Sequence, residues 1–204
     1  MKRLLFLFIL AVSIAHGITA QDFDGYYTAS LDINQPVANT NWVNTLSGPG
    51  VRLGYHRFLN EKFSLGGDIN WGTYKQYQPT ETIQNQSGAV TTDYFKYVYA
   101  YGIVLSGRYY IPTSRRLIKP YAGLGLGAAY NKYTLFYNTY TDQTKAWGFL
   151  ARPEAGLLFR FNERRSIGAT IGLHFDYSTA QAKSYGYNSF SNIGFTIGLI
   201  GIDW

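Results

Sequence analysis

The chain ends in residues 191–204, which read SNIGFTIGLIGIDW. This stretch is rich in β-branched and aromatic residues, which favour strands, and Asp203 is its only charged side chain. A final strand with an unpaired edge would offer free backbone groups to other chains. Pairing with the first strand of the chain would remove that edge. The stretch therefore predicts a sheet that closes on itself as a β-barrel.

Seven further segments upstream alternate apolar and polar residues with the period of two that is typical of strands. The expected strands are Gly25–Gln35, Gly50–Phe58, Phe63–Gly72, Tyr94–Ile111, Pro120–Tyr130, Trp147–Phe161 and Ser166–Tyr177. The connections between them are alternately long and short, and residues 76–93 are expected to form a long polar loop. This alternation is typical of membrane barrels, whose short turns face the periplasm. The fold class predicted is all-β, an eight-stranded antiparallel up-and-down transmembrane β-barrel.

One face of these strands is aliphatic or aromatic, and the other carries titratable side chains. A soluble barrel would expose the apolar face to water as one very large patch. In a membrane barrel that face contacts lipid, and the titratable groups lie inside. Four Arg then stand against four carboxylates, with two His, and we expect an ion-paired interior polar network. Its expected members are Asp32, Arg52, His56, Asp68, Arg108, Arg152, Glu154, Arg160, His174 and Asp176.

The first twenty residues have the pattern of a secretory signal peptide. Lys2 and Arg3 precede an apolar run from Leu4 to Ala15, and Ala20 provides a small residue for cleavage. The apolar run is shorter than the roughly 20 residues that a transmembrane helix needs. We expect residues 1–20 to be removed after Ala20 and residues 21–204 to form one barrel domain in the outer membrane.

The composition excludes several classes of function. The chain has no Cys, and therefore no disulfide framework and no Cys-ligated metal site. Its basic residues are scattered, so no nucleic-acid-binding stripe is predicted. His56 and His174 lack a metal-ligand spacing, and no cofactor is expected. The 19 Tyr and 22 Gly suit a narrow barrel with aromatic belts at the membrane surfaces.

The signal peptide, the eight amphipathic strands and the aromatic C-terminus together resemble the small outer-membrane barrels of the outer membrane protein A and X type. The resemblance extends to the broad family described as the outer membrane protein β-barrel domain. It implies insertion by the barrel-assembly machinery, which reads a Gly and two apolar residues near the end of the last strand. Gly198, Ile202 and Trp204 are the matching residues here. No peptidoglycan-binding domain is expected after the last strand.

Gly198 lies one residue upstream of the position that this assembly signal usually has. By simple alternation Phe195, Ile197 and Leu199 share one face, whereas Ile202 and Trp204 fall on the other. If all five contact lipid, a β-bulge near residues 200–201 is required. Gly194, Thr196, Gly198 and Asp203 would then face the interior.

The function expected from these features is that of an integral outer-membrane protein whose barrel anchors surface loops for binding or adhesion. Outer-membrane lipids are its expected partners, and the sequence does not identify the surface ligand. The alternative is a lipid A-modifying hydrolase or acyltransferase that uses His174, Asp176 and Ser178, which share one face of a strand. A narrow pore lined by Arg152, Glu154 and Arg160 is the third hypothesis. Same-face polar residues are common in barrel strands, so the non-enzymatic interpretation is favoured.

Overall fold

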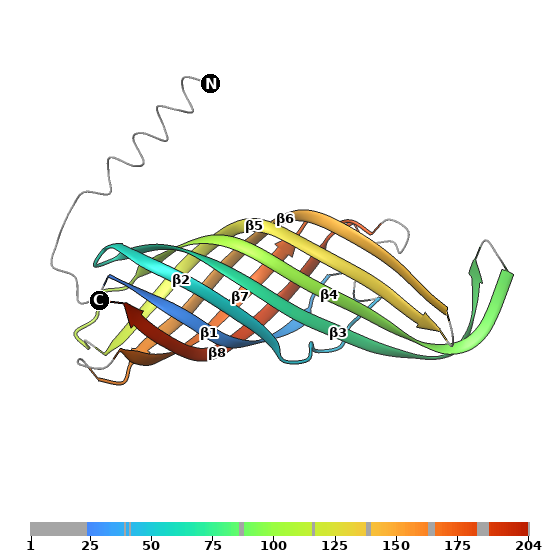
Figure 1. Ribbon diagram of the computed structural model, residues 1–204, viewed down its shortest axis with the longest axis horizontal. Helices are drawn as coiled ribbons and strands as arrows, with labels where there is room; N and C mark the ends of the chain where they lie inside the picture. Colours follow the sequence, from blue (N-terminus) through green and yellow to red (C-terminus); the bar gives the residue numbers. More distant parts are fainter. Residues whose placement is uncertain are drawn as a thin grey trace, which may run out of the picture.

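Eight strands account for most of the chain in the computed structural model (Figure 1). The structure describes residues 24–38, 40, 42–85, 88–115, 117–137, 140–162, 166–182 and 188–203. The strands are β1 (Gly25–Pro36), β2 (Gly50–Asn60), β3 (Phe63–Asn85), β4 (Gly88–Tyr110), β5 (Ile118–Tyr137), β6 (Tyr140–Arg160), β7 (Ile167–Ser178) and β8 (Phe190–Asp203). Within these ranges no helix is long and apolar enough to cross a membrane. The expected signal peptide, residues 1–20, lies outside the described residues.

Each strand pairs antiparallel with its neighbours in the sequence, and β1 also pairs with β8. The seam between these two strands is continuous, from Gly25 opposite Asp203 to Pro36 opposite Asn192. Every strand therefore has a partner on both sides, and the sheet is a closed barrel. The predicted all-β fold of eight antiparallel up-and-down strands is confirmed.

The outer surface of the barrel is an apolar band. Alternate residues along each strand point outward, and several of them are more than half exposed, such as Ile103 at 62% and Leu105 at 63%. The intervening residues point into the lumen and are mostly buried. This arrangement reverses that of a soluble barrel and is the one that a strand in contact with lipid requires.

The strands have unequal lengths. β3 and β4 have 23 residues each, whereas β1 has 12 and β2 has 11. The predicted loop over residues 76–93 is wrong, because β3 and β4 continue through it as a paired hairpin. Thr and Gln are frequent there, and residues 79–82 are all exposed, so this part of the hairpin has no buried apolar face. Figure 1 shows this hairpin projecting beyond all the other strands at the right, past the ends of β5 and β6.

The predicted β-bulge in the last strand is also wrong. The register of β8 with both neighbours continues without a shift through residues 200–201. Ile200 and Ile202 point into the lumen and are 2% and 7% exposed. Asp203 does not face the interior network, and its carboxylate accepts a hydrogen bond from Tyr55 Oη at 3.1 Å. The apolar residues of β8 thus contact lipid on the outer face of the strand and an apolar cluster on its inner face.

Two apolar clusters occupy the ends of the lumen. The turn-side cluster lies near the short turns and consists of Tyr26, Phe58, Tyr110, Tyr121, Leu158, Ile200 and Ile202. The loop-side cluster lies near the long connections and consists of Val43, Tyr74, Val98, Tyr133, Ala146, Ala180, Ala182 and Phe190. In the second cluster, Val43 comes from the β1–β2 connection, and Ala180 and Ala182 come from the β7–β8 connection.

Gly127 provides a test of how tightly this barrel is packed. A Cβ atom at Gly127 would lie 1.9 Å from the carbonyl oxygen of Ile103, whereas one at Gly201 would have no atom within 4 Å. Because backbone must move to admit the methyl group, we expect Gly127→Ala to lower the free energy of unfolding by about 1–3 kcal/mol. Denaturant unfolding in lipid vesicles measures this difference. Gly201→Ala is the matched control, and an equal effect of the two substitutions would contradict the packing described.

Candidate functional site

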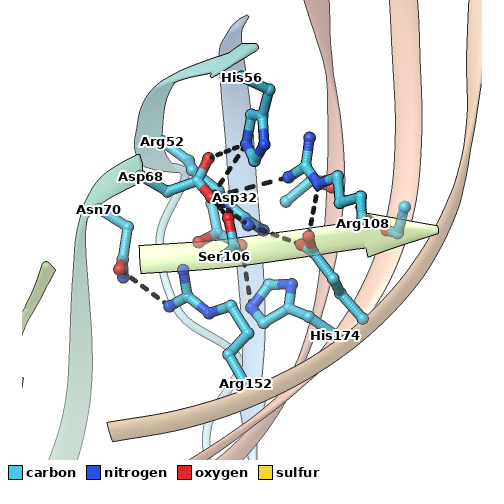
Figure 2. Close-up of polar contacts among 12 residues, drawn as sticks. Asp32, Arg52, His56, Asp68, Asn70, Ser106, Arg108, Arg152 and His174 are labelled. Atoms are coloured by element: carbon cyan, nitrogen blue, oxygen red, sulfur yellow. Dashed lines mark hydrogen bonds and ion pairs between the residues drawn. The ribbon is translucent and has the colours of Figure 1, made fainter. Parts of the chain in front are cut away.

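The centre of the lumen holds a network of buried ions from four strands (Figure 2). Glu154 on β6 accepts hydrogen bonds from Arg52 Nη2 on β2 and from Arg108 Nε on β4, both at 2.6 Å. These bonds cross the lumen between strands that are not neighbours in the sheet. The Glu154 carboxylate thus links three strands, β2, β4 and β6, across the lumen.

Asp68 on β3 completes this central group. Its carboxylate lies 3.2 Å from Arg52 Nη2 and 3.3 Å from His56 Nε2, and it accepts a 2.8 Å hydrogen bond from Ser106 Oγ. Arg108 also donates from Nη1 to Tyr26 Oη at 2.9 Å, which joins the charged group to the turn-side cluster. Partners on both oxygens reduce the cost of burying these charges away from water.

A second group lies toward the loop-side cluster. Arg152 on β6 forms a bidentate pair with Asp176 on β7, through Nε at 2.5 Å and Nη2 at 2.6 Å. The Nη2 atom also donates to Asn70 Oδ1 at 2.8 Å. The parallel arrangement of two donors against two carboxylate oxygens is the geometry that makes Arg pairs strong and directional.

All ten residues expected in the interior network lie in the lumen and are buried, from 0% exposure at Arg152 and His56 to 7% at Glu154. Asp32 lies beside His174, with 3.6 Å between Oδ1 and Nε2. Arg160 lies at the short-turn end of β6. The sequence pattern thus identified which residues point inward. It did not show which of them contact one another across the lumen.

His174, Asp176 and Ser178 each bind a different group. His174 Nε2 lies 3.1 Å from Asn34 Oδ1, while both Asp176 oxygens accept hydrogen bonds from Arg152. Ser178 Oγ accepts a hydrogen bond from the Ala180 amide at 3.2 Å and is 3% exposed. Among the described residues no hydrogen bond joins His174 to Ser178. The serine activation expected in the hydrolase hypothesis is therefore not formed by these contacts.

The lumen is occupied along its length by side chains. Of the residues of the pore hypothesis, Arg152 and Glu154 lie between the two apolar clusters, and their ion pairs span the interior. Arg160 lies beyond Leu158, at the short-turn end of β6. The interior of an eight-stranded barrel is just wide enough for side chains to fill it. In the described part of the chain no three His, Cys, Asp or Glu residues are grouped as metal ligands.

Of the two assembly-signal residues that the structure describes, Ile202 departs from the expected contact with lipid. Gly198 points inward, where a Cβ would lie 2.3 Å from the carbonyl oxygen of Ala29. Ile202 belongs to the turn-side cluster. Trp204 lies outside the described residues.

The extracellular ends of β3–β6 form a four-stranded sheet that the sequence analysis missed. We call this part, residues 72–85, 88–100, 131–137 and 140–146, the extracellular sheet. On its inner side Tyr94 Oη donates to Glu81 at 2.9 Å, and Lys96 Nζ lies 5.1 Å from the Trp42 ring centroid. The pairing of β3 with β4 shifts register between Gln78 and Glu81, and the signal available in the sequence was the polar composition of residues 76–93. It is weak, because such residues are equally common in loops.

Glu154→Gln tests the central network. The substitution leaves Arg52 and Arg108 buried with one carboxylate, Asp68, between them. Because breaking a buried ion pair leaves a charge uncompensated, we expect the free energy of unfolding in vesicles to fall by about 3–5 kcal/mol. Glu61→Gln, in the exposed β2–β3 turn, should change it by less than about 0.5 kcal/mol. Similar small effects for both variants would show that the network contributes little.

Comparison with known proteins agrees with this architecture. The family model described as "Outer membrane protein beta-barrel domain" matches residues 4–200. Ail, the attachment invasion locus protein of Yersinia pestis, solved with the heparin analogue sucrose octasulfate, is a structural neighbour. It has 12% identity and a TM-score of 0.51, over 87% of this chain and 99% of Ail. Neisserial surface protein A has 15% identity and a TM-score of 0.52, over 90% and 99% of the two chains.

A comparison with curated protein sequences gave no match. At these identities the structural neighbours show the fold alone. The family match covers almost the whole chain, and it agrees with the closed barrel and its apolar outer band. The chain belongs to the outer membrane protein β-barrel domain family and is a protein of the cell outer membrane.

Proposed function

We propose that this protein is a surface-binding or adhesion protein, in which the barrel is the membrane anchor and the extracellular sheet is the contact surface. The observation that carries the proposal is the unequal length of the strands. β3–β6 have 20 to 23 residues, whereas β1, β2, β7 and β8 have 11 to 14. Strands of about 9–11 residues suffice to cross the hydrocarbon, so the additional length is not needed for anchoring.

The β1–β2 connection supports the base of the extracellular sheet. The Asn44 amide donates to Gln76 Oε1 at 2.7 Å, and Thr45 Oγ1 donates to the Lys75 carbonyl oxygen at 2.5 Å. The Gly48 amide donates to the Thr73 carbonyl oxygen at 3.0 Å. These bonds are made to residues 73–76 of β3, beyond the point where β3 pairs with the first residues of β2. A supported sheet loses little conformational freedom when it binds, which favours affinity.

The inner side of the extracellular sheet combines aromatic rings with charges. Tyr94, Leu135 and Tyr137 form an apolar cluster on which Trp42 packs. Burial and the adjacent Glu81 carboxylate raise the pKa of Tyr94 to about 12, so its hydroxyl remains a donor at neutral pH. Aromatic faces beside charged and hydrogen-bonding groups suit the apolar and hydroxyl faces of sugars. We therefore propose glycans as the first class of ligand to test.

We also propose that residues 1–20 act as the export signal and are cleaved after Ala20. Insertion by the barrel-assembly machinery, with Gly198, Ile202 and Trp204 as its signal, is part of the same proposal. Membership of the outer membrane protein β-barrel domain family supports it.

Trimming the extracellular sheet tests the proposed function. Tyr77 and Phe95 are register partners, so Asn-Gly in place of residues 78–94 should close a two-residue hairpin without disturbing the barrel. We expect cells carrying the trimmed protein to lose at least about tenfold of their binding to an array of immobilised glycans, because hot-spot contacts dominate binding energy. The heat-modifiable gel shift of folded barrels should persist.

Glu61→Ala/Lys62→Ala, in a short turn at the opposite end, is the control and should bind as the native protein does. Two results would contradict the proposal. One is the absence of glycan binding by the native protein on the array. The other is undiminished binding by the trimmed variant.

A further inference from the structure

Two lysines face each other on the outer wall of the barrel. Lys132 on β5 and Lys145 on β6 are direct register partners, and both belong to the outward-facing positions of their strands. Like charges directly opposite on one face of a sheet are destabilising. A negative charge close to both ammonium groups would therefore stabilise the pair.

The protein does not supply that charge in its described part. Neither lysine forms an ion pair with a described residue, and the same is true of Lys75, which is exposed on the outward face of β3. Asp93 lies near the start of β4, and its carboxylate accepts a hydrogen bond from Tyr77 Oη at 3.4 Å. The outer wall of the extracellular sheet is thus locally cationic.

Tyrosine and phenylalanine rings on β4 hold two of these ammonium groups against the wall. Lys132 Nζ lies 5.7 Å from the ring centroid of Tyr99, and Lys75 Nζ lies 4.4 Å from that of Phe95. Tyr97 and Tyr99 are stacked, with centroids 5.8 Å apart and an interplanar angle of 9°. Cation–π contacts of this kind place a charge without neutralising it, so each lysine remains available to an anion.

The lysine pair adjoins an aromatic belt. Tyr130 lies two residues before Lys132, and Trp147 lies two residues after Lys145, on the same outward face. The two rings are 4.8 Å apart, and Trp147 is 69% exposed. Exposed Trp and Tyr mark the membrane–water interface. Beyond that interface, a side chain on the outer wall meets lipid headgroups.

We propose that Lys132 and Lys145 bind a phosphate group on the headgroup of an outer-leaflet lipid, with Lys75 as an additional cationic contact. Each ammonium has three donors, and a phosphate oxygen is an acceptor that strengthens such bonds by its charge. A phosphate between the two lysines converts their repulsion into two attractions. The site is on the outer wall and is independent of what the inner side of the extracellular sheet binds.

A lipid is favoured over a soluble anion by position. The pair lies beside Tyr130 and Trp147, on the wall that continues into the apolar band. A lipid headgroup is therefore present there at high local concentration, and the attraction of basic residues to anionic lipids is greatest close to the surface.

Binding of lipid A to the refolded full chain tests the proposal. Native mass spectrometry in detergent would compare bisphosphorylated lipid A with chemically dephosphorylated lipid A. We expect Lys132→Gln/Lys145→Gln to weaken binding of the phosphorylated form at least tenfold. Lys62→Gln/Arg115→Gln removes the same charge from the exposed short turns and should weaken it less than twofold. Equal losses in the two variants, or equal binding of both lipids by the native protein, would overturn the proposal.

Stability in two bilayers separates the lipid site from general packing. In neutral phosphatidylcholine vesicles, Lys132→Gln/Lys145→Gln should unfold at the same or a higher denaturant concentration than the native protein, since repulsion is removed. In vesicles that also contain bisphosphorylated lipid A the order should reverse. An unchanged order would overturn the proposal. The proposal would also be overturned if Lys132→Gln/Lys145→Gln lost binding to a soluble sulfated oligosaccharide while its stability relative to the native protein did not depend on lipid A. That result would show that the lysines bind a soluble polyanion.

Discussion

The structure depends on one constraint, that every backbone N–H and C=O group inside the hydrocarbon must find its partner within the protein. β1 and β8 satisfy it by pairing along the whole of β1, from Gly25 to Pro36. With that seam closed, each strand is hydrogen-bonded on both sides and the sheet has no edge in lipid. The free edges that remain belong to the extracellular sheet, where water can hydrogen-bond to the backbone and the β1–β2 connection covers part of β3.

Closure also determines where the charges lie. Within the hydrocarbon, each side chain of the barrel points either to lipid or into a narrow lumen, so ionised groups at that depth can be accommodated only inside. Arg52, Arg108 and Glu154 therefore pair across the barrel, and Arg152 pairs with Asp176. Apolar clusters at both ends separate these pairs from the surrounding water. The same narrowness requires glycine where backbones approach closely, as at Gly127. The closed sheet thus explains both the position of the charges and the filled interior.

Alternation in the sequence was enough to predict the eight strands, their order and the ten inward-facing titratable residues. Alternation failed at positions that do not follow the rule that outward side chains contact lipid and inward side chains are polar. Residues 76–93 are predicted to form a loop because their sequence is polar and shows no continuous apolar face, although they pair as a hairpin. Ile202 is predicted to contact lipid, yet it lies in the turn-side cluster, because an apolar side chain in the lumen departs from the simple rule. The contact of Arg52 with Glu154 joins β2 to β6, and no local pattern indicates a contact between strands that are not neighbours.

The seam between β1 and β8 is the most direct test, and the absence of native Cys makes it accessible to disulfide cross-linking. Leu31 and Ile197 are direct partners, so their Cβ atoms should be about 4.5–5.5 Å apart, whereas a partner displaced by two residues is about 7–8 Å away. Leu31→Cys/Ile197→Cys, oxidised in outer-membrane fractions, should form an intramolecular disulfide that changes migration on a denaturing gel. Leu31→Cys/Leu199→Cys should form little. Preferential cross-linking of the displaced pair, or of cysteines in different chains, would contradict the closed and regular seam.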